Sequence, residues 1–189
     1  MDHKIVQVYY GNGKGKTSAA VGQCIRAASS GQTAIIIQFL KGKDAEEFSF
    51  LGKLEPDIKL FRFEKDDNSY ADLLESQKKE EKLNILNGFN FAKKVLDTGE
   101  CDVLVLDEVL GLIDLDILTL EDIIQLIEMC DDFTKLVLTG QSLPEELVPY
   151  ANSISRIEWE KDDTIYSQLR QEEEALTDII MVGCNGRMG

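Results

Sequence analysis

The sequence has 189 residues, of which 43% are hydrophobic and 29% are charged, and its formal net charge at pH 7 is −15. A chain of this length buries about 70% of the surface that it would expose when unfolded, so we expect one domain, residues 1–189, with its own core. The acidic excess repels a phosphate backbone, and no apolar run reaches the roughly 20 residues that span a bilayer, which argues against nucleic acids and membranes as partners.

The first predicted element is a strand over residues 5–9, with the sequence Ile-Val-Gln-Val-Tyr. Residues 1–4 run directly into this strand and leave no room for the basic, apolar and cleavage regions of a signal peptide. We therefore expect a cytoplasmic protein.

A glycine-rich loop follows this strand and precedes a segment, from residue 19, that is compatible with a helix. This order is typical of a phosphate-binding loop (Walker A motif), because glycines let backbone N–H groups approach a triphosphate and the helix N-terminus adds partial positive charge. The motif is a variant, since Tyr10 stands where a glycine is usual, five residues before Gly15. The alternative is a lysine-rich turn that binds nothing. The residues that we expect to bind the nucleoside triphosphate are Gly11, Asn12, Gly13, Lys14, Gly15, Lys16, Thr17 and Ser18.

Lys16 and Thr17 carry the chemistry expected of this loop. Lys16 adds a mobile positive charge, and the Thr17 hydroxyl can bind Mg²⁺. Because the net charge of −15 also repels a triphosphate, binding must depend on local positive groups, namely Lys14, Lys16, the helix end and a divalent cation. We therefore expect Mg²⁺ as a cofactor.

Two strands are predicted next. Residues 33–40 are rich in β-branched residues and predict a buried parallel strand, whereas residues 58–63 alternate apolar and polar residues, as a strand nearer the sheet edge does. Gln38 and Lys41 end the first of these strands, where side chains face the ligand crevice. These two residues either contact the ligand or have no part in binding it, and the sequence leaves both alternatives open.

A helix is predicted over residues 71–96, which carry an amphipathic apolar stripe. Its mixed charges at residues 78–82 favour a solvated face over a binding patch. The aromatic side chains of Phe63, Tyr70 and Trp159 could stack on a flat ligand, but aromatic residues at this density are more often part of the core.

Residues 101–108 predict a buried strand that ends in two carboxylates, Asp107 and Glu108. A protein with a phosphate-binding loop needs an acid at such a strand end, to hold Mg²⁺ or its water shell. We expect Asp107 to bind the metal together with Thr17, and Glu108 to orient or accept a group. The candidate catalytic residues are thus Lys16, Asp107 and Glu108. The alternative is that both carboxylates are merely exposed to solvent.

The rest of the chain predicts two helices, two strands and an acidic extension. Residues 119–122 resemble a capping box before an apolar helical stripe, residues 134–140 predict a strand, and Ser142 is expected to cap a short helix. A last strand is expected near residues 153–159. Residues 160–189 form a strongly acidic C-terminal extension, in which we expect a helix and a tail with solvated glutamates.

Strands that alternate with helices at this spacing indicate an α/β fold, in which a mostly parallel sheet lies between helices and the nucleotide binds at the carboxyl ends of the strands. The four cysteines contain no Cys-x-x-Cys pair, which favours free, buried thiols over a zinc site. His3 is the only histidine, so a histidine-based triad and a polyhistidine metal centre are excluded.

Five segments extend these motifs, namely residues 9–20, 26–28, 38–42, 105–108 and 138–140. Together they resemble the ATP:corrinoid adenosyltransferases of the RecA-like type, over about residues 4–158. The shifted glycines of the loop belong to the pattern of that family. The resemblance implies a P-loop NTPase-like (RecA-like) α/β fold with a mostly parallel sheet sandwiched by helices.

The resemblance also implies an activity. Enzymes of this family transfer the 5′-deoxyadenosyl group of ATP to a Co(I) corrinoid and release triphosphate, in cobalamin metabolism. Cobalt supplies the nucleophile, and Lys14, Lys16, the loop amides and Mg²⁺ would stabilise the leaving triphosphate. By the same resemblance, ATP and a reduced corrinoid are the substrates, the protein forms a homodimer, and a reductase is a partner.

Three segments depart from the family pattern. The family has a glycine-aromatic-Thr-Trp segment where residues 63–70 stand here, an arginine in place of Gln141, and a Lys-His and aromatic-Gly closing segment that residues 160–189 lack. Two alternatives follow, a P-loop phosphotransferase or ATPase and a non-catalytic ATP-binding regulatory protein. Product identity separates them, because adenosyl transfer releases triphosphate, phosphoryl transfer releases ADP, and a regulatory protein releases neither.

Overall fold

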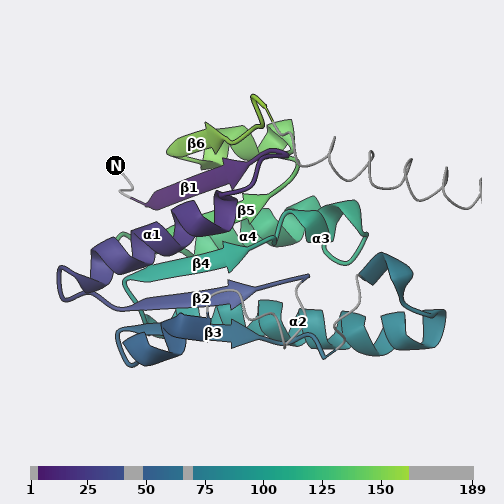
Figure 1. Cartoon of the computed structure of the whole chain (residues 1–189), viewed down its shortest axis with the longest axis horizontal. Helices are drawn as coiled ribbons and strands as arrows, with labels where there is room; N and C mark the ends of the chain where they lie inside the picture. Colours follow the sequence, from purple (N-terminus) through teal and green to yellow (C-terminus); the bar gives the residue numbers. More distant parts are fainter. Residues whose placement is uncertain (1–3, 41–48, 66–69, 162–189) are drawn as a thin grey trace, which may run out of the picture. The chain divides into compact units, whose positions relative to one another are not determined.

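A computed structural model of the chain describes residues 4–40, 49–65 and 70–161. The six strands within these residues form one sheet with every neighbouring pair parallel, in the order β3-β2-β4-β5-β1-β6 (Figure 1). The strands are β1 (Ile5–Tyr10), β2 (Ala34–Gln38), β3 (Ile58–Arg62), β4 (Val103–Asp107), β5 (Lys135–Gly140) and β6 (Ser153–Arg156). This sheet confirms the predicted α/β fold, and β3 lies at one edge, as its alternating sequence indicated.

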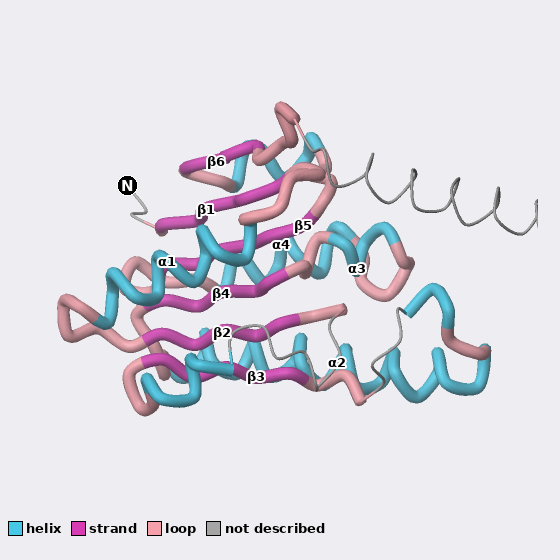
Figure 2. The backbone as a smooth tube through the Cα atoms, in the orientation of Figure 1, coloured by secondary structure: helices cyan, strands magenta, loops and turns pink. Residues whose placement is uncertain are grey.

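Helices cover both faces of the sheet (Figures 1 and 2). The helix α1 (Lys16–Ala28) packs on one face, and α2 (Glu75–Thr98) and α4 (Leu120–Met129) pack on the other. Four short elements complete the described part of the chain: α3 (Gly111–Asp114) and the 3₁₀ helices η1 (Ser49–Leu54), η2 (Tyr70–Asp72) and η3 (Glu145–Tyr150).

Alternate residues of each central strand face the two layers of helices. In β4, Val103 and Val105 belong to the apolar cluster that includes α1, whereas Leu104 and Leu106 belong to the cluster that includes α2 and α4. All five residues of β4 are buried. The last of them, Asp107, therefore continues the α1 side of the strand.

Some element boundaries differ from the prediction. The strand β2 ends at Gln38 and not at residue 40, because Leu40 has a φ of +59°, a left-handed conformation that cannot continue a strand. The helix α2 begins at Glu75 and not at residue 71, because the 3₁₀ turn η2 comes first. The element α3 was not predicted.

One predicted cap is confirmed and one is wrong. The Thr119 hydroxyl accepts a hydrogen bond from the Asp122 N–H (3.2 Å), which completes the predicted capping box of α4. Ser142 does not cap η3, because its Oγ donates to Asp114 Oδ2 (2.7 Å) and Pro144 precedes the helix instead.

The cysteines match the expectation of buried thiols where they are described. Cys24, Cys101 and Cys130 are free and buried, and burial raises the pKa of both Cys24 and Cys101 to about 12. Neutral thiols at these positions behave as small core residues.

Contacts group Met1–Glu158 into one compact unit and Trp159–Gly189 into a second, of which residues 159–161 are described. None of the helices in the described ranges combines the length and the apolar character that crossing a membrane requires. Four sequence predictions lie outside the described residues: those on His3, Lys41, Cys184 and the helix and tail after residue 161.

Candidate functional site

The last residues of neighbouring strands form one polar row across the sheet. Gln38 of β2 pairs in register with Arg62 of β3 and with Asp107 of β4. The register of β4 with β5 brings Thr139 into the same row. Residues two places earlier, such as Val105, pack on the side of α1. The row therefore lies at the carboxyl edge of the sheet, on the face that α1 covers.

Asp107 lies within this row and is fully buried. Its Oδ1 accepts a hydrogen bond from Thr139 Oγ1 (2.8 Å), and its Oδ2 accepts one from Gln38 Nε2 (2.9 Å). The hydroxyl of Thr17, in the first turn of α1, lies 3.0 Å from both carboxylate oxygens. The structure thus brings together Thr17 and Asp107, the two residues predicted to share a metal. The alternative that both strand-end carboxylates are solvent-exposed is wrong for Asp107.

The surroundings of Asp107 suit a divalent cation. Its hydrogen-bond donors are two hydroxyls and an amide, and among the described residues no cationic side chain is hydrogen bonded to it. A buried carboxylate is stabilised by positive charge, and carboxylate and hydroxyl oxygens are ligands that Mg²⁺ prefers. Over those same described ranges no group of three or more His, Cys, Asp or Glu could hold a metal.

Glu108 has a different environment from Asp107, although the two are adjacent in sequence. Its φ is +59°, an uncommon conformation for a residue other than glycine. Its N–H donates to Thr139 Oγ1 (2.7 Å). The Thr139 hydroxyl therefore contacts both acidic residues, since it donates to the Asp107 carboxylate and accepts from the Glu108 amide.

Lys16 folds over the phosphate-binding loop. Its Nζ donates to the carbonyl oxygens of Gly11 (2.8 Å) and Gly13 (3.1 Å), and the residue is only 8% exposed. These bonds hold the ammonium group against the loop and not in bulk solvent.

Gly11 and Gly13 also serve contacts within the protein. Gly11 has a φ of +115°, and a Cβ there would lie 2.3 Å from the carbonyl oxygen of Ile157. A Cβ on Gly13 would lie 2.9 Å from the backbone of Glu158. The N–H of Gly11 donates to the Gln141 carbonyl (3.0 Å) and that of Gly13 to the Ile157 carbonyl (2.9 Å). These two glycines therefore let the loop pack against the segment that follows β6, a role that the motif alone does not reveal.

A pocket of about 500 Å³ opens at the loop, a volume within the range of small-molecule sites. It is lined by Asn12, Gly13, Lys14, Gly15, Lys16, Thr17, Ser18 and Glu108. All the predicted ATP-binding residues except Gly11 thus share one pocket with Glu108. Asp107 adjoins this pocket through its hydrogen bond with Thr17.

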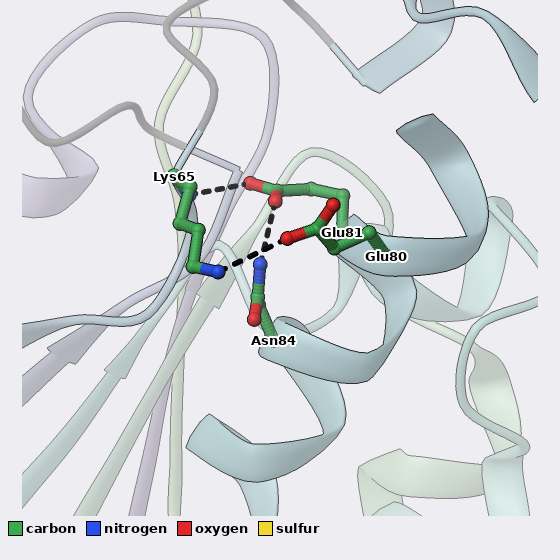
Figure 3. A network of polar contacts seen from close by, with 4 residues as sticks. All are labelled: Lys65, Glu80, Glu81 and Asn84. Atoms are coloured by element: carbon green, nitrogen blue, oxygen red, sulfur yellow. Dashed lines mark hydrogen bonds and ion pairs between the residues drawn. The ribbon is translucent and has the colours of Figure 1, made fainter. Parts of the chain in front are cut away.

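The segment after β3 is fixed to α2 (Figure 3). The Lys65 N–H donates to Glu81 Oε1 (2.9 Å), and Lys65 Nζ donates to Glu80 Oε1 (3.0 Å). Asn84 Nδ2 donates to Glu81 Oε2 (2.9 Å). Glu81 is buried, so the prediction of a solvated face over residues 78–82 is wrong at this position, where the carboxylate accepts a backbone N–H from the neighbouring segment.

Glu64 is buried next to this network. Its Oε1 accepts a hydrogen bond from the Leu40 N–H (2.8 Å), whereas its Oε2 is buried without a partner. Burial, with a smaller contribution from the Glu81 charge, raises the pKa of Glu64. Phe63 and Tyr70 pack against the apolar cluster that includes α2, which agrees with their interpretation as core residues. The same interpretation is wrong for Trp159, which is exposed.

Arg62 and Thr139 were given no role by the sequence analysis, and the role of Gln38 was left open. All three are polar residues at or near the end of a strand whose preceding residues are largely apolar. That position is a signal in the sequence that could have singled them out, and Gln38 and Thr139 also lie in segments that carry the family resemblance.

Comparison with known proteins extends these observations. The family model described as ATP:corrinoid adenosyltransferase BtuR/CobO/CobP matches residues 2–172. The corrinoid adenosyltransferase of Escherichia coli K12 is 27% identical over 154 residues, which are 81% of this chain and 76% of that protein. The corrinoid adenosyltransferase CobA of Salmonella typhimurium is 28% identical over the same shares of the two chains.

Solved structures with a similar fold are known as well. A KaiC-like protein from Pyrococcus horikoshii superimposes with a TM-score of 0.55 at 17% sequence identity, covering 85% of this chain and 75% of its own. At this identity the similarity concerns the fold alone, and it agrees with a RecA-like arrangement of strands and helices.

Proposed function

Because the chain belongs to the ATP:corrinoid adenosyltransferase family, whose model matches residues 2–172, we propose that it transfers the 5′-deoxyadenosyl group of ATP to a Co(I) corrinoid. The electron pair of cobalt forms the bond to the 5′ carbon, and the bond between that carbon and the triphosphate oxygen breaks. The leaving triphosphate takes the electron pair of the broken bond. No protein nucleophile is needed for this step.

The observation that carries this proposal is the pocket at the glycine-rich loop, which joins Lys14, Lys16 and the start of α1. A departing triphosphate accumulates negative charge, and fixed positive groups around it lower the barrier. We assign this stabilisation to the two lysines, the backbone amides of the loop and the helix N-terminus. In this proposal the loop binds a leaving group, unlike the loop of a kinase, which positions a phosphoryl group for transfer.

We assign Mg²⁺ to Thr17 and Asp107, whose oxygens form the donor set described above. When bound there, Mg²⁺ would neutralise part of the triphosphate charge. Glu108 lies on the pocket wall, and we assign it the orientation of a bound group.

The corrinoid side of the site differs from the family pattern. Residues 63–70, which follow β3, lack the glycine-aromatic-Thr-Trp pattern of the family, and Gln141 follows β5 in place of an arginine. We infer that the chain binds its corrinoid through contacts that differ from those of the family. We also infer that it acts as a homodimer and that a separate reductase supplies the Co(I) corrinoid.

The test is a product assay with the full chain, Mg²⁺, ATP and a chemically reduced corrinoid. Adenosyl transfer is expected to change the cobalt absorption spectrum and to release triphosphate. Lys16→Ala is expected to lose most of this activity, whereas Lys59→Ala, which removes an exposed lysine of β3 away from the pocket, is the matched control.

Two results would contradict the proposal. Formation of ADP without adenosylcorrinoid would assign the site to phosphoryl transfer or ATP hydrolysis. Retention of ATP with neither product would assign it to nucleotide-dependent regulation.

A further inference from the structure

Gln38 lies between a cationic side chain and the buried acid of the site. Its Nε2 donates to Asp107 Oδ2 (2.9 Å), and its Oε1 accepts from Arg62 Nε (2.8 Å). Gln38 is 1% exposed, and the register places it beside both partners in the polar row. The amide therefore links Arg62 to Asp107 without exposure to water.

The orientation of this amide follows from the chemistry of its two neighbours. A guanidinium has only donors, so Arg62 requires the amide oxygen on its own side. An ionised carboxylate has only acceptors, so Asp107 requires the NH₂ group. The two demands agree only in the observed orientation. Without Arg62 the amide could turn over and present its oxygen to Asp107, where two acceptors would meet.

The Asp107 carboxylate is then held from both sides. Gln38 bonds one oxygen and Thr139 bonds the other, from the two strands that flank β4. The Thr17 hydroxyl bonds both oxygens. Residues that fix the orientation of a metal-binding carboxylate typically change metal affinity by about 10- to 100-fold when they are removed.

We propose that Gln38, oriented by Arg62, is a positioning residue that holds Asp107 for the Mg²⁺ of the bound nucleotide. This inference rests on the proposed function only for the binding of ATP with Mg²⁺. Neither Gln38 nor Arg62 lines the pocket at the loop, so both act through Asp107.

The test compares the binding of ATP in excess Mg²⁺ with its binding in a chelator, by titration calorimetry on the full chain. Gln38→Met keeps the volume of the side chain and removes both hydrogen bonds. Arg62→Met removes the group that orients the amide. Each variant is expected to weaken the binding of Mg²⁺-ATP about tenfold, and to change the binding of metal-free ATP by less than about twofold.

Two further variants sharpen the comparison. The double variant Gln38→Met/Arg62→Met is expected to bind no more weakly than Gln38→Met, because Arg62 acts through Gln38. Gln23→Met is the matched control, since Gln23 is an amide on the same face that bonds Tyr9 and Lys135 and does not touch Asp107. This control should bind both forms of ATP as the unmodified chain does.

Equal weakening with and without Mg²⁺ would overturn the inference and give Gln38 a purely structural role. Unchanged binding in both conditions would overturn it as well, as would an unmodified chain that binds ATP no better with Mg²⁺. If Gln38→Met fails to fold, the binding of ATP by Arg62→Met tests the inference instead. Arg62 is half-buried at the end of an edge strand, so we expect the fold to tolerate its replacement. An unmodified chain that binds Mg²⁺-ATP and makes no adenosylcorrinoid would refute the proposed function and leave this inference standing.

Discussion

At the level of single residues, the site depends on one hydroxyl that contacts two acids. Thr139 Oγ1 donates to the Asp107 carboxylate and accepts from the Glu108 N–H. A hydroxyl offers one donor and two acceptor positions, so a single side chain satisfies both groups. Loss of that hydroxyl would remove the acceptor of the Glu108 N–H and one of the two donors to Asp107 Oδ1, which would keep the Thr17 hydroxyl.

Thr139→Val is therefore expected to lower activity by about 10- to 100-fold and to destabilise the fold by about 1–3 kcal/mol. Thr139→Ser keeps the hydroxyl and should lose much less of either. Urea unfolding and the product assay measure the two effects. Equal behaviour of the valine and serine variants would show that the hydroxyl is unimportant.

Glu64 is expected to make stability depend on pH. Burial raises its pKa in the folded chain above the ordinary value of 4.5, so the folded chain holds the proton more tightly than the unfolded chain does. Its contribution to stability is fully present below about pH 4.5 and is lost as the pH rises through the folded-state pKa, with a slope of up to about 1.4 kcal/mol per pH unit.

Glu64→Gln keeps an acceptor for the Leu40 N–H and cannot ionise. In urea titrations between about pH 4.5 and 8, the stability of the unmodified chain relative to this variant should fall with rising pH. A constant difference between the two proteins would show that Glu64 has the same pKa in both states.

The candidate site residues were predictable from local sequence, but the residues that hydrogen bond to them were not. Lys16, Thr17 and Asp107 follow from a motif and from a strand that ends in acids. Gln38 and Thr139 hold Asp107 from strands that are 69 and 32 positions away in the sequence. Only the strand order and register show that they meet, and neither is encoded in a short pattern.

At the level of elements, two glycines within helices have opposite roles. A Cβ on Gly88 of α2 would lie 2.9 Å from the Phe63 ring and 3.1 Å from the Phe39 ring, so this glycine makes room for aromatic side chains that follow β2 and β3. A Cβ on Gly22 of α1 would meet nothing within 4 Å. Gly88 thus sets how closely α2 approaches the sheet, and Gly22 does not affect packing.

Gly88→Ala is expected to destabilise the protein by about 1–3 kcal/mol through overpacking. Gly22→Ala should stabilise it by about 0.5–1 kcal/mol, because alanine loses less backbone entropy in a helix. Urea unfolding of the pair measures both changes. If both substitutions stabilise the protein, the Phe63 and Phe39 side chains can move away from position 88 without lowering the free energy of unfolding.

Element types were predicted better than element ends. Continuous apolar runs predicted β2, β4 and β5 correctly, because strands that are buried on both faces have apolar residues at nearly every position. The end of β2 was wrong by two residues, because the left-handed conformation of Leu40 is not the preference of a leucine. The four-residue helix α3 is too short to show a helical period.

At the level of the whole molecule, the net charge of −15 favours expansion through repulsion between like charges. Salt screens this repulsion. Raising KCl from about 20 to about 500 mM is therefore expected to raise the midpoint of thermal unfolding by about 2–4 °C, equivalent to about 1 kcal/mol at this chain length. Differential scanning calorimetry measures the shift, and a midpoint that stays constant or falls would show that favourable ion pairs dominate.

The contact of Gly11 and Gly13 with residues 157–158 joins the two ends of the compact unit's sequence. A side chain added to either glycine would collide with that backbone. Because the contact is with the main chain, residues 157 and 158 can change their side chains freely, whereas positions 11 and 13 accept a larger residue only if the chain after β6 moves away.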